Sequence, residues 1–190
     1  MVTPSDSCGG TIEHHLPHLF DDGPNSRARA DALGARTYEL VRRLTDATGM
    51  EGVWPSYPGA VTHRDTCSGL REMGIKSQPC ALLHTVEGLS LTGMADSEVC
   101  RGFGGTFCVK YPDISTRVVS DKAADVVRTG ADTVLAGDMG CLLDIAGRSK
   151  REGNPVRVRH VAEVLAGMTD EVPPIGTSRG GATAPADAAV

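Results

Sequence analysis

The stretch Cys100-Arg-Gly-Phe-Gly-Gly-Thr-Phe-Cys-Val-Lys-Tyr111 combines three glycines with two cysteines and two phenylalanines. Glycines allow backbone conformations that bring a loop very close to a bound group. A cysteine at the start of such a loop is a candidate metal or redox ligand. Taken alone, the stretch is more typical of a turn with a buried cysteine. The positions of the other cysteines decide between these interpretations.

Strands and helices are predicted to alternate around this loop. Strands are expected at 59–63, 89–92, 133–136 and 155–159, and helices at 78–86, 114–128 and 160–168, with a further helix ending at Arg151. Before them, helices are expected at 9–20 and 26–48. The alternation predicts an α/β fold, a mostly parallel sheet flanked by helices. Sites in such folds form beyond the carboxyl ends of the strands.

Four cysteines fall at this expected edge. Cys8 follows a remnant strand expected at Val2-Thr3, Cys67 follows the strand that ends at His63, and Cys141 follows the strand that ends at Ala136. Each of these cysteines also opens a helix, a short one in the case of Cys67, and Cys100 lies in the glycine-rich loop. A helix N-terminus stabilises a thiolate, the form of cysteine that binds metal. Several thiolates brought together by a fold suit an iron–sulfur cluster or zinc.

The composition limits the function classes. The net charge of −5 argues against a nucleic-acid surface, and no apolar run is long enough to span a membrane. The first residues lack the features of a signal peptide, so we expect a cytoplasmic protein. Thiols stay reduced there, so the six cysteines are interpreted as ligands, catalytic thiols or core residues. There is no CxxC pair.

Several motifs, in order, resemble the cysteine-rich CCG family. They are His63-Arg-Asp-Thr-Cys67, Val99-Cys-Arg-Gly-Phe-Gly-Gly-Thr-Phe107, Ala136-Gly-Asp-Met-Gly-Cys141 and Arg159-His-Val-Ala-Glu-Val-Leu165. The family includes iron–sulfur components of glycolate oxidase and of heterodisulfide reductase, and the similarity is greatest to its lactate utilisation protein A branch. The similarity extends from Val2 to Met168.

The resemblance implies a [4Fe-4S]-type cluster. Its ligands would be Cys67, Cys100, Cys141 and Cys8, and the cofactor-binding loop would contain Gly102, Gly104 and Gly105. The family carries two cysteine modules, so the chain is expected to comprise a helical remnant of the first (1–57), the second α/β module (58–168) and a disordered, dispensable tail (169–190). It looks like the carboxyl-terminal two thirds of its relatives, through a truncated gene, a misplaced start or a split subunit.

One departure from the family affects the expected cluster. Arg101 stands where the family has the second cysteine of Cys-Cys-Gly, so we expect the cluster to be substoichiometric. Alternatively Arg101 is a surface residue that pairs with Glu98 or Asp138. Cys80 and Cys108 are also unusual for the family, and no role is assigned to them.

The resemblance implies an electron-transfer subunit that helps to oxidise L-lactate or another 2-hydroxy acid. Its partners would be subunits with ferredoxin-type clusters, and these subunits would share the substrate chemistry. The first alternative is a degenerate, non-catalytic α/β module that binds no metal, or zinc through the three thiols and Cys108. The second is a thiol redox protein that uses Cys100 and Cys108.

Overall fold

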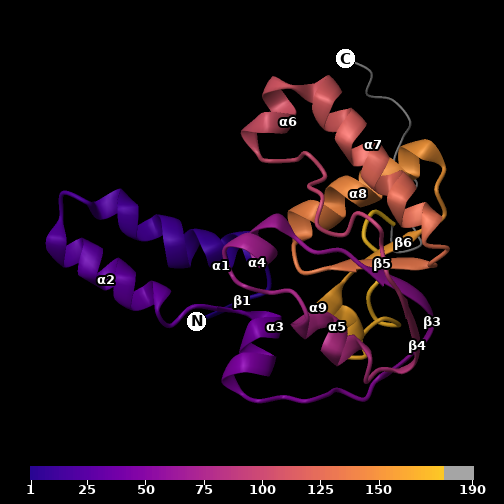
Figure 1. The fold of residues 1–190 in the computed structure, drawn as a ribbon, viewed down its shortest axis with the longest axis horizontal. Coiled ribbons are helices and arrows are strands. Elements are labelled where there is room, and N and C mark those ends of the chain that lie inside the picture. Colours follow the sequence, from indigo (N-terminus) through magenta and orange to yellow (C-terminus); the bar gives the residue numbers. More distant parts are fainter. Residues whose placement is uncertain (178–190) are drawn as a thin grey trace.

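The computed structural model describes residues 1–177. Its main sheet has four parallel strands in the order β4-β3-β5-β6 (Figure 1). These are β3 (Ser56–His63), β4 (Glu87–Thr92), β5 (Thr133–Ala136) and β6 (Arg157–His160). Parallel strands need crossover connections, which helices supply. The predicted α/β class with a parallel sheet is therefore confirmed.

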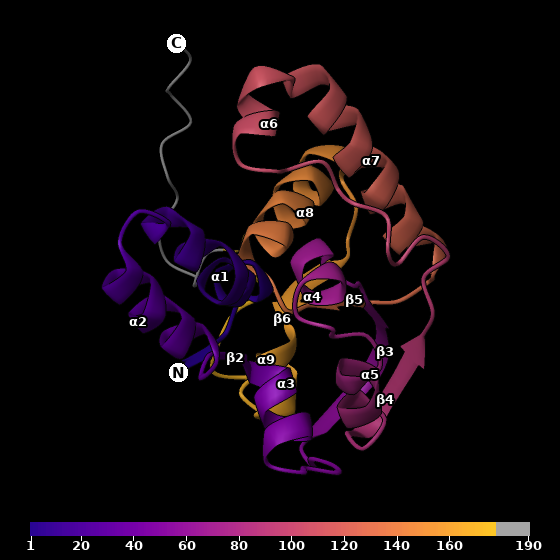
Figure 2. The ribbon, with the colours of Figure 1, turned by 60° about the vertical axis from the view of Figure 1, so that its left-hand side comes forward.

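Helices cover both faces of this sheet. On one face lie α7 (Pro112–Arg128) and α8 (Met139–Glu152), and on the other lie α5 (Gln78–Leu83) and α9 (Val161–Leu165), as Figures 1 and 2 show. Each face of the sheet has its own apolar core, and successive residues of β5 contribute to different ones. Leu135 belongs to the core cluster that contains Val164 of α9, whereas Val134 and Ala136 belong to the cluster that contains Ile145 of α8.

The first 47 residues differ most from expectation. In place of a helix over 26–48 the structure has α2 (Pro24–Gly34), the short strand β2 (Tyr38–Glu39), α3 (Leu40–Arg42) and the π-helical turn η3 (Arg43–Ala47). Similarly, 9–20 is divided into α1 (Asp6–Gly10), η1 (Thr11–His15) and η2 (Leu16–Phe20). β2 pairs in parallel with β1 (Val2–Thr3), and this long-range pairing overrides local helix propensity.

β1 and β5 lead into their helices in the same way. The N-cap comes two residues after each strand, at Ser5 and Asp138, and a cysteine follows three residues later, at Cys8 and Cys141. The two N-caps are joined, because the Ser5 hydroxyl donates to Asp138 Oδ2 at 2.9 Å. The β1–α1 segment and the β5–α8 segment therefore meet at the N-termini of their helices, where Cys8 and Cys141 lie.

Residues 169–177 follow α9 and are tied to β6. The backbone N–H of Ile175 donates to the carbonyl of Val158 at 2.8 Å, and Arg159 donates to the carbonyls of Thr169 and Val172. The rest of the expected tail, 178–190, lies outside the described residues.

Candidate metal centre

Two of the predicted ligands stand at capped helix starts. Cys67 is the first residue of α4 (Cys67–Arg71), whose N-cap Thr66 accepts from the N–H of Gly69. Cys141 lies in the first turn of α8, where its own N–H donates to the N-cap Asp138 at 3.2 Å. In both cases the cap sets the direction in which the helix leaves the sheet edge.

Cys100 is held by the glycine-rich loop. The N–H of Gly102 donates to the Cys100 sulfur at 3.3 Å. Gly102 has φ of 82°, and a Cβ there would come within 2.9 Å of Val118. Gly104 and Gly105 also have positive φ, at 47° and 56°. The loop therefore needs glycine to fold back onto Cys100, and it ends in a short helix, α6 (Thr106–Lys110), that was not predicted.

The structure brings three of the four predicted thiols together. The Cys67 thiol donates a hydrogen bond to Cys100, which is the main reason why the pKa of Cys100 falls to about 5. The same hydrogen bond raises the pKa of Cys67, because its proton is held in place. Burial raises the pKa of Cys141, which lies close enough to act on Cys67 through charge. Cys100 is thus a thiolate beside two thiols.

Buried cations surround these sulfurs. Arg64 is 0% exposed, and its charge favours the thiolate at all three cysteines, although the pKa values of Cys67 and Cys141 are raised on balance. Arg101 is also buried, against the expectation of a surface residue; it stacks on Phe103 and lies 3.8 Å from Asp144, not beside Glu98 or Asp138. Burial, and then the nearby charge of Arg64, lower the pKa of Lys122.

The remaining cysteines lie elsewhere. Cys8 is exposed on α1, and no described contact joins it to the other three thiols. The Cys108 thiol donates to the carbonyl of Gly105, so its present orientation does not complete a zinc site. Burial raises the pKa of Cys80, and the next influence is Asp65.

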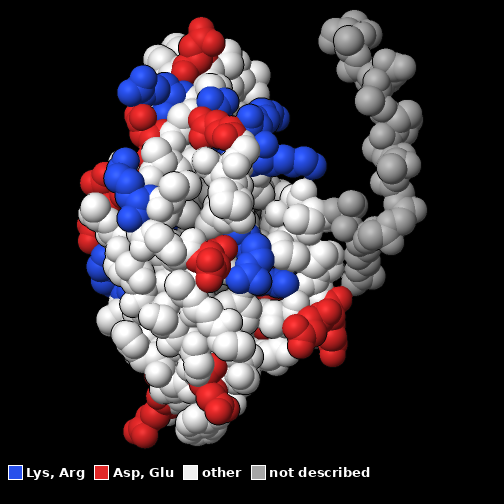
Figure 3. Space-filling view, turned by 90° about the vertical axis from the view of Figure 1, so that its right-hand side faces the viewer, with Lys and Arg blue, Asp and Glu red and all other residues white. Residues whose placement is uncertain are grey.

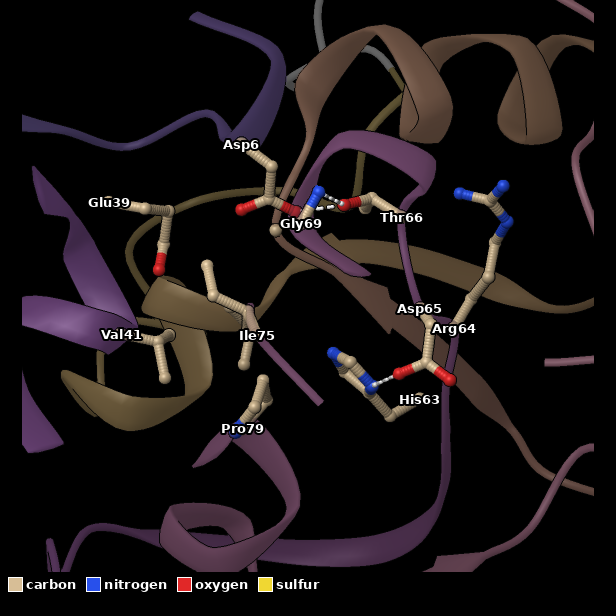
Figure 4. Close-up of a pocket in the computed structure, with 12 residues that line it drawn as sticks. Asp6, Glu39, Val41, His63, Arg64, Asp65, Thr66, Gly69, Ile75 and Pro79 are labelled. Carbon is tan, nitrogen blue, oxygen red and sulfur yellow. Dashed lines mark hydrogen bonds and ion pairs between the residues drawn. The ribbon is translucent and has the colours of Figure 1, made fainter. Parts of the chain in front are cut away.

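A second polar cluster lies beside the centre, in a cavity of about 10 Å³, which is room for one water molecule. Burial raises the pKa of Asp6 to about 8 and lowers that of His63 to about 4, so both are neutral near pH 7. Figure 4 shows Thr66 turned toward Asp6, and its hydroxyl donates to that carboxyl group. Glu39 completes the cluster, and burial raises its pKa.

Sequence reasoning overlooked Arg64 as a site residue, although it lies within the motif that ends at Cys67. The available signal was its place directly after a strand, at the edge where the cysteines were expected. Its burial without a carboxylate partner depends on tertiary packing and has no sequence signature. Asp138, which the sequence offered as a possible partner of a surface Arg101, is buried; burial alone would raise its pKa, and hydrogen bonds from Ser7 and Ser5 outweigh this and lower it.

The donor set fits a sulfur-bridged cluster better than a single ion. Within residues 1–177, no three His, Cys, Asp or Glu side chains are close enough to hold one metal ion. Three sulfurs that influence one another and that two buried guanidinium groups also influence suit a larger anionic group, which would reach each sulfur separately. Arg101 occupies space beside Cys100 where a fourth thiol would extend the set.

The fold and the three converging cysteines define a cysteine-rich α/β domain. A family model described as "Cysteine-rich domain" (CCG) matches residues 61–146. "Lactate utilization protein A" of Bacillus cytotoxicus is 43% identical over 165 residues, covering 87% of this chain and 69% of that protein. The proteins of the same name from Geobacillus kaustophilus and an Exiguobacterium species are 42% and 39% identical, with 69% and 67% of their lengths covered. The chain belongs to the lactate utilization protein A family.

Charged side chains of both signs lie on the surface of the molecule. On the face shown in Figure 3, basic and acidic side chains are interspersed, and no extended basic patch covers it. None of the helices in the described part of the chain has both the length and the apolar character needed to cross a membrane.

Proposed function

We propose that this chain carries an iron–sulfur cluster and transfers electrons in the oxidation of L-lactate or another 2-hydroxy acid. The observation that carries the proposal is the meeting of Cys67, Cys100 and Cys141 beside buried cations. Family membership supports the metabolic assignment, because the relatives are named for lactate utilisation. The cluster, of [4Fe-4S] type by resemblance, would supply one-electron transfer.

Each residue of the centre has a separate part in this proposal. Cys67, Cys100 and Cys141 would hold the iron through thiolates, and Cys8 would contribute only if α1 changed its orientation. Gly102 keeps the loop close to the Cys100 sulfur. The electrons would pass to and from partner subunits with ferredoxin-type clusters, and the substrate chemistry would be shared with them.

Anaerobic reconstitution with iron and sulfide tests the ligand set. Wild-type protein should bind both and gain visible absorption that dithionite bleaches. Cys67→Ala, Cys100→Ala and Cys141→Ala should each lose most of the bound iron. Cys80→Ala and Cys108→Ala are matched controls from the same chain and should retain it. Loss in the controls alone, or zinc binding without visible absorption, would refute the assignment.

Arg101 provides a second test. Its guanidinium cannot bind iron as a thiolate does, and it lies beside Cys100 and Cys141, whose pKa values it lowers. We expect substoichiometric iron in the wild type and higher iron and sulfide content in Arg101→Cys. Arg101→Ser removes the cation without adding a ligand and separates the two effects. Equal, full occupancy in all three proteins would show that position 101 plays no part in binding.

A further inference from the structure

Arg64 is a buried cation with no carboxylate partner in the described part of the chain, and the side chain that it contacts by hydrogen bonding is the thiol of Cys141. It is 0% exposed, and its Nε, Nη1 and Nη2 atoms make no hydrogen bond to nitrogen or oxygen within residues 1–177. A guanidinium group stays protonated in proteins and carries five N–H donors. Burying such a charge unpaired costs several kcal/mol. Native structures leave few polar groups in this state, and each calls for an explanation.

The backbone determines where this side chain points. The N–H of Arg64 donates to the carbonyl of Leu135, so the residue still belongs to the ladder between β3 and β5. Successive side chains along an extended strand point to opposite sides. All three residues of His63-Arg64-Asp65 line the cavity, but the guanidinium group of Arg64 extends away from Asp6 and Glu39, as Figure 4 shows.

The neighbouring carboxylates do not neutralise Arg64. No Asp or Glu in the described part of the chain lies within 4.0 Å of its nitrogens. Asp144 pairs with Arg101 at 3.8 Å, and Asp125 lies between Lys122 and Arg128. The charge of Arg64 acts on the sulfurs of Cys67, Cys100 and Cys141, and also on Lys122 and Asp144.

We propose that Arg64 is a positioning residue that donates N–H···S hydrogen bonds to the sulfur atoms of the bound cluster. The inference rests on the proposed function and goes beyond the ligand set. Hydrogen bonds to sulfur and nearby positive charge both stabilise the more negative, reduced state, so Arg64 raises the reduction potential. It also offsets the mutual repulsion of three thiolates during assembly.

Two substitutions separate charge from hydrogen-bond geometry. Arg64→Met has a similar length without charge, and Arg64→Lys keeps the charge without the planar fork. After anaerobic reconstitution, Arg64→Met should hold less than about half the wild-type iron and sulfide, with a more negative midpoint potential. Arg64→Lys should have an iron and sulfide content and a midpoint potential between those of wild type and Arg64→Met. Arg159→Met is the control, because Arg159 is also buried but its Nη1 and Nη2 atoms donate to Glu163 and to two carbonyls.

The cluster-free protein gives an independent readout. If Arg64 is held for a bound group, its removal relieves a buried charge that no carboxylate neutralises, and Arg64→Met should melt about 3 °C or more above wild type. Arg159→Met should melt below wild type and leave the potential of the cluster unchanged. A structural role for Arg64 would instead lower the melting temperature of the cluster-free variant.

The outcomes are distinguishable. Wild type that takes up no iron and sulfide would overturn the proposed function, and this inference with it. A wild type that fills normally, together with an Arg64→Met protein of equal content and equal potential, would overturn the inference alone. A cluster-free Arg64→Met protein that melts below wild type would do the same.

Discussion

At the scale of single residues, Cys100 has the most altered chemistry in the centre. Its pKa is lowered to about 5 by the hydrogen bond from Cys67, assisted by the Gly102 N–H and two buried guanidinium groups, while burial acts in the opposite direction. At pH 6 roughly nine tenths of this sulfur is thiolate, compared with under a hundredth for an ordinary cysteine. The thiolate is the nucleophilic form.

Alkylation of the cluster-free protein tests this state. Iodoacetamide at pH 6 should modify Cys100 before Cys108, which lies on the same loop and donates to a carbonyl. Cys67→Ala removes the donor and should slow the alkylation of Cys100 by roughly tenfold at this pH. Cys67→Ser keeps an O–H donor and should retain most of the rate. Peptide mapping by mass spectrometry gives both rates, and equal rates in all three proteins would contradict the proposed hydrogen bond.

Asp6 makes the stability of the fold depend on pH. Burial holds the folded-state pKa at about 8, whereas the unfolded carboxyl titrates near pH ~3.9. Between these values the folded state binds more protons than the unfolded state, so this residue makes stability fall as pH rises from about 4 to about 8. The loss then levels off.

Asp6→Asn should remove this dependence. Asparagine is neutral at every pH, and its amide oxygen can still accept from Thr66. Urea unfolding at pH 8.5 should show the variant more stable than wild type by on the order of 2 kcal/mol, with a difference under about 1 kcal/mol at pH 4. Asp113→Asn, at an exposed position of α7, is the control for lost charge alone. A constant difference across this pH range would refute the assignment to Asp6.

At the scale of elements, the sequence predicted best where the local pattern and the tertiary context agree. The apolar strand β5 and the amphipathic helix α7 lie close to their expected bounds. The helix predicted over residues 26–48 is wrong because β2 is stabilised by pairing with β1, which is distant in sequence. The strand-edge rule predicted that Cys67, Cys100 and Cys141 lie near one another, since parallel strands share one carboxyl edge, and in the structure Cys100 and Cys141 both influence the pKa of Cys67. It could not predict the burial of Arg64 and Arg101, which depends on how α7 and α8 pack.

The glycine-rich loop allows steric crowding to be tested separately from backbone strain. Gly102→Ala introduces a Cβ at φ of 82° and 2.9 Å from Val118, whereas Gly105→Ala has φ of 56° and no atom within 4 Å. Gly105→Ala should cost about 1 kcal/mol of unfolding free energy, from backbone strain alone. Gly102→Ala should cost roughly 2–3 kcal/mol. Because the clash with Val118 would displace the backbone N–H that donates to Cys100, only Gly102→Ala should lose iron after reconstitution. Equal behaviour of the two variants would show that the loop relaxes freely.

At the scale of the whole molecule, contacts between distant segments hold the centre in place. Asp138 accepts hydrogen bonds from Ser5 and Ser7, the backbone of Asp6 bonds to Gly137, and His160 bonds to the carbonyl of Pro4. The β1–α1 segment is thereby attached to the carboxyl edge of the main sheet, next to Cys141. Residues 169–177 are attached to β6 in a similar way. Their composition gave no indication of this attachment, because the attachment depends on Arg159 and not on local apolar content.

Truncation after Met168 tests that second attachment. The cut removes the carbonyls of Thr169 and Val172, each 2.8 Å from a nitrogen of the buried Arg159, and it removes Ile175, which packs against the core cluster of α7, α8 and β6. Two charged N–H groups would lose their partners, and apolar surface would be exposed. The loss should be on the order of 3 kcal/mol, which corresponds to a fall in Tm of about 6–12 °C.

Truncation after Thr177 keeps every one of these contacts and is the matched control for chain shortening. Ile175→Ala in the full chain should account for about 1–2 kcal/mol of the loss, and the remainder belongs to Arg159. Differential scanning calorimetry of the cluster-free proteins measures all three effects. A truncation after Met168 that melts with the full-length chain would show that residues 169–177 add nothing to the stability of the domain, as their composition alone predicts.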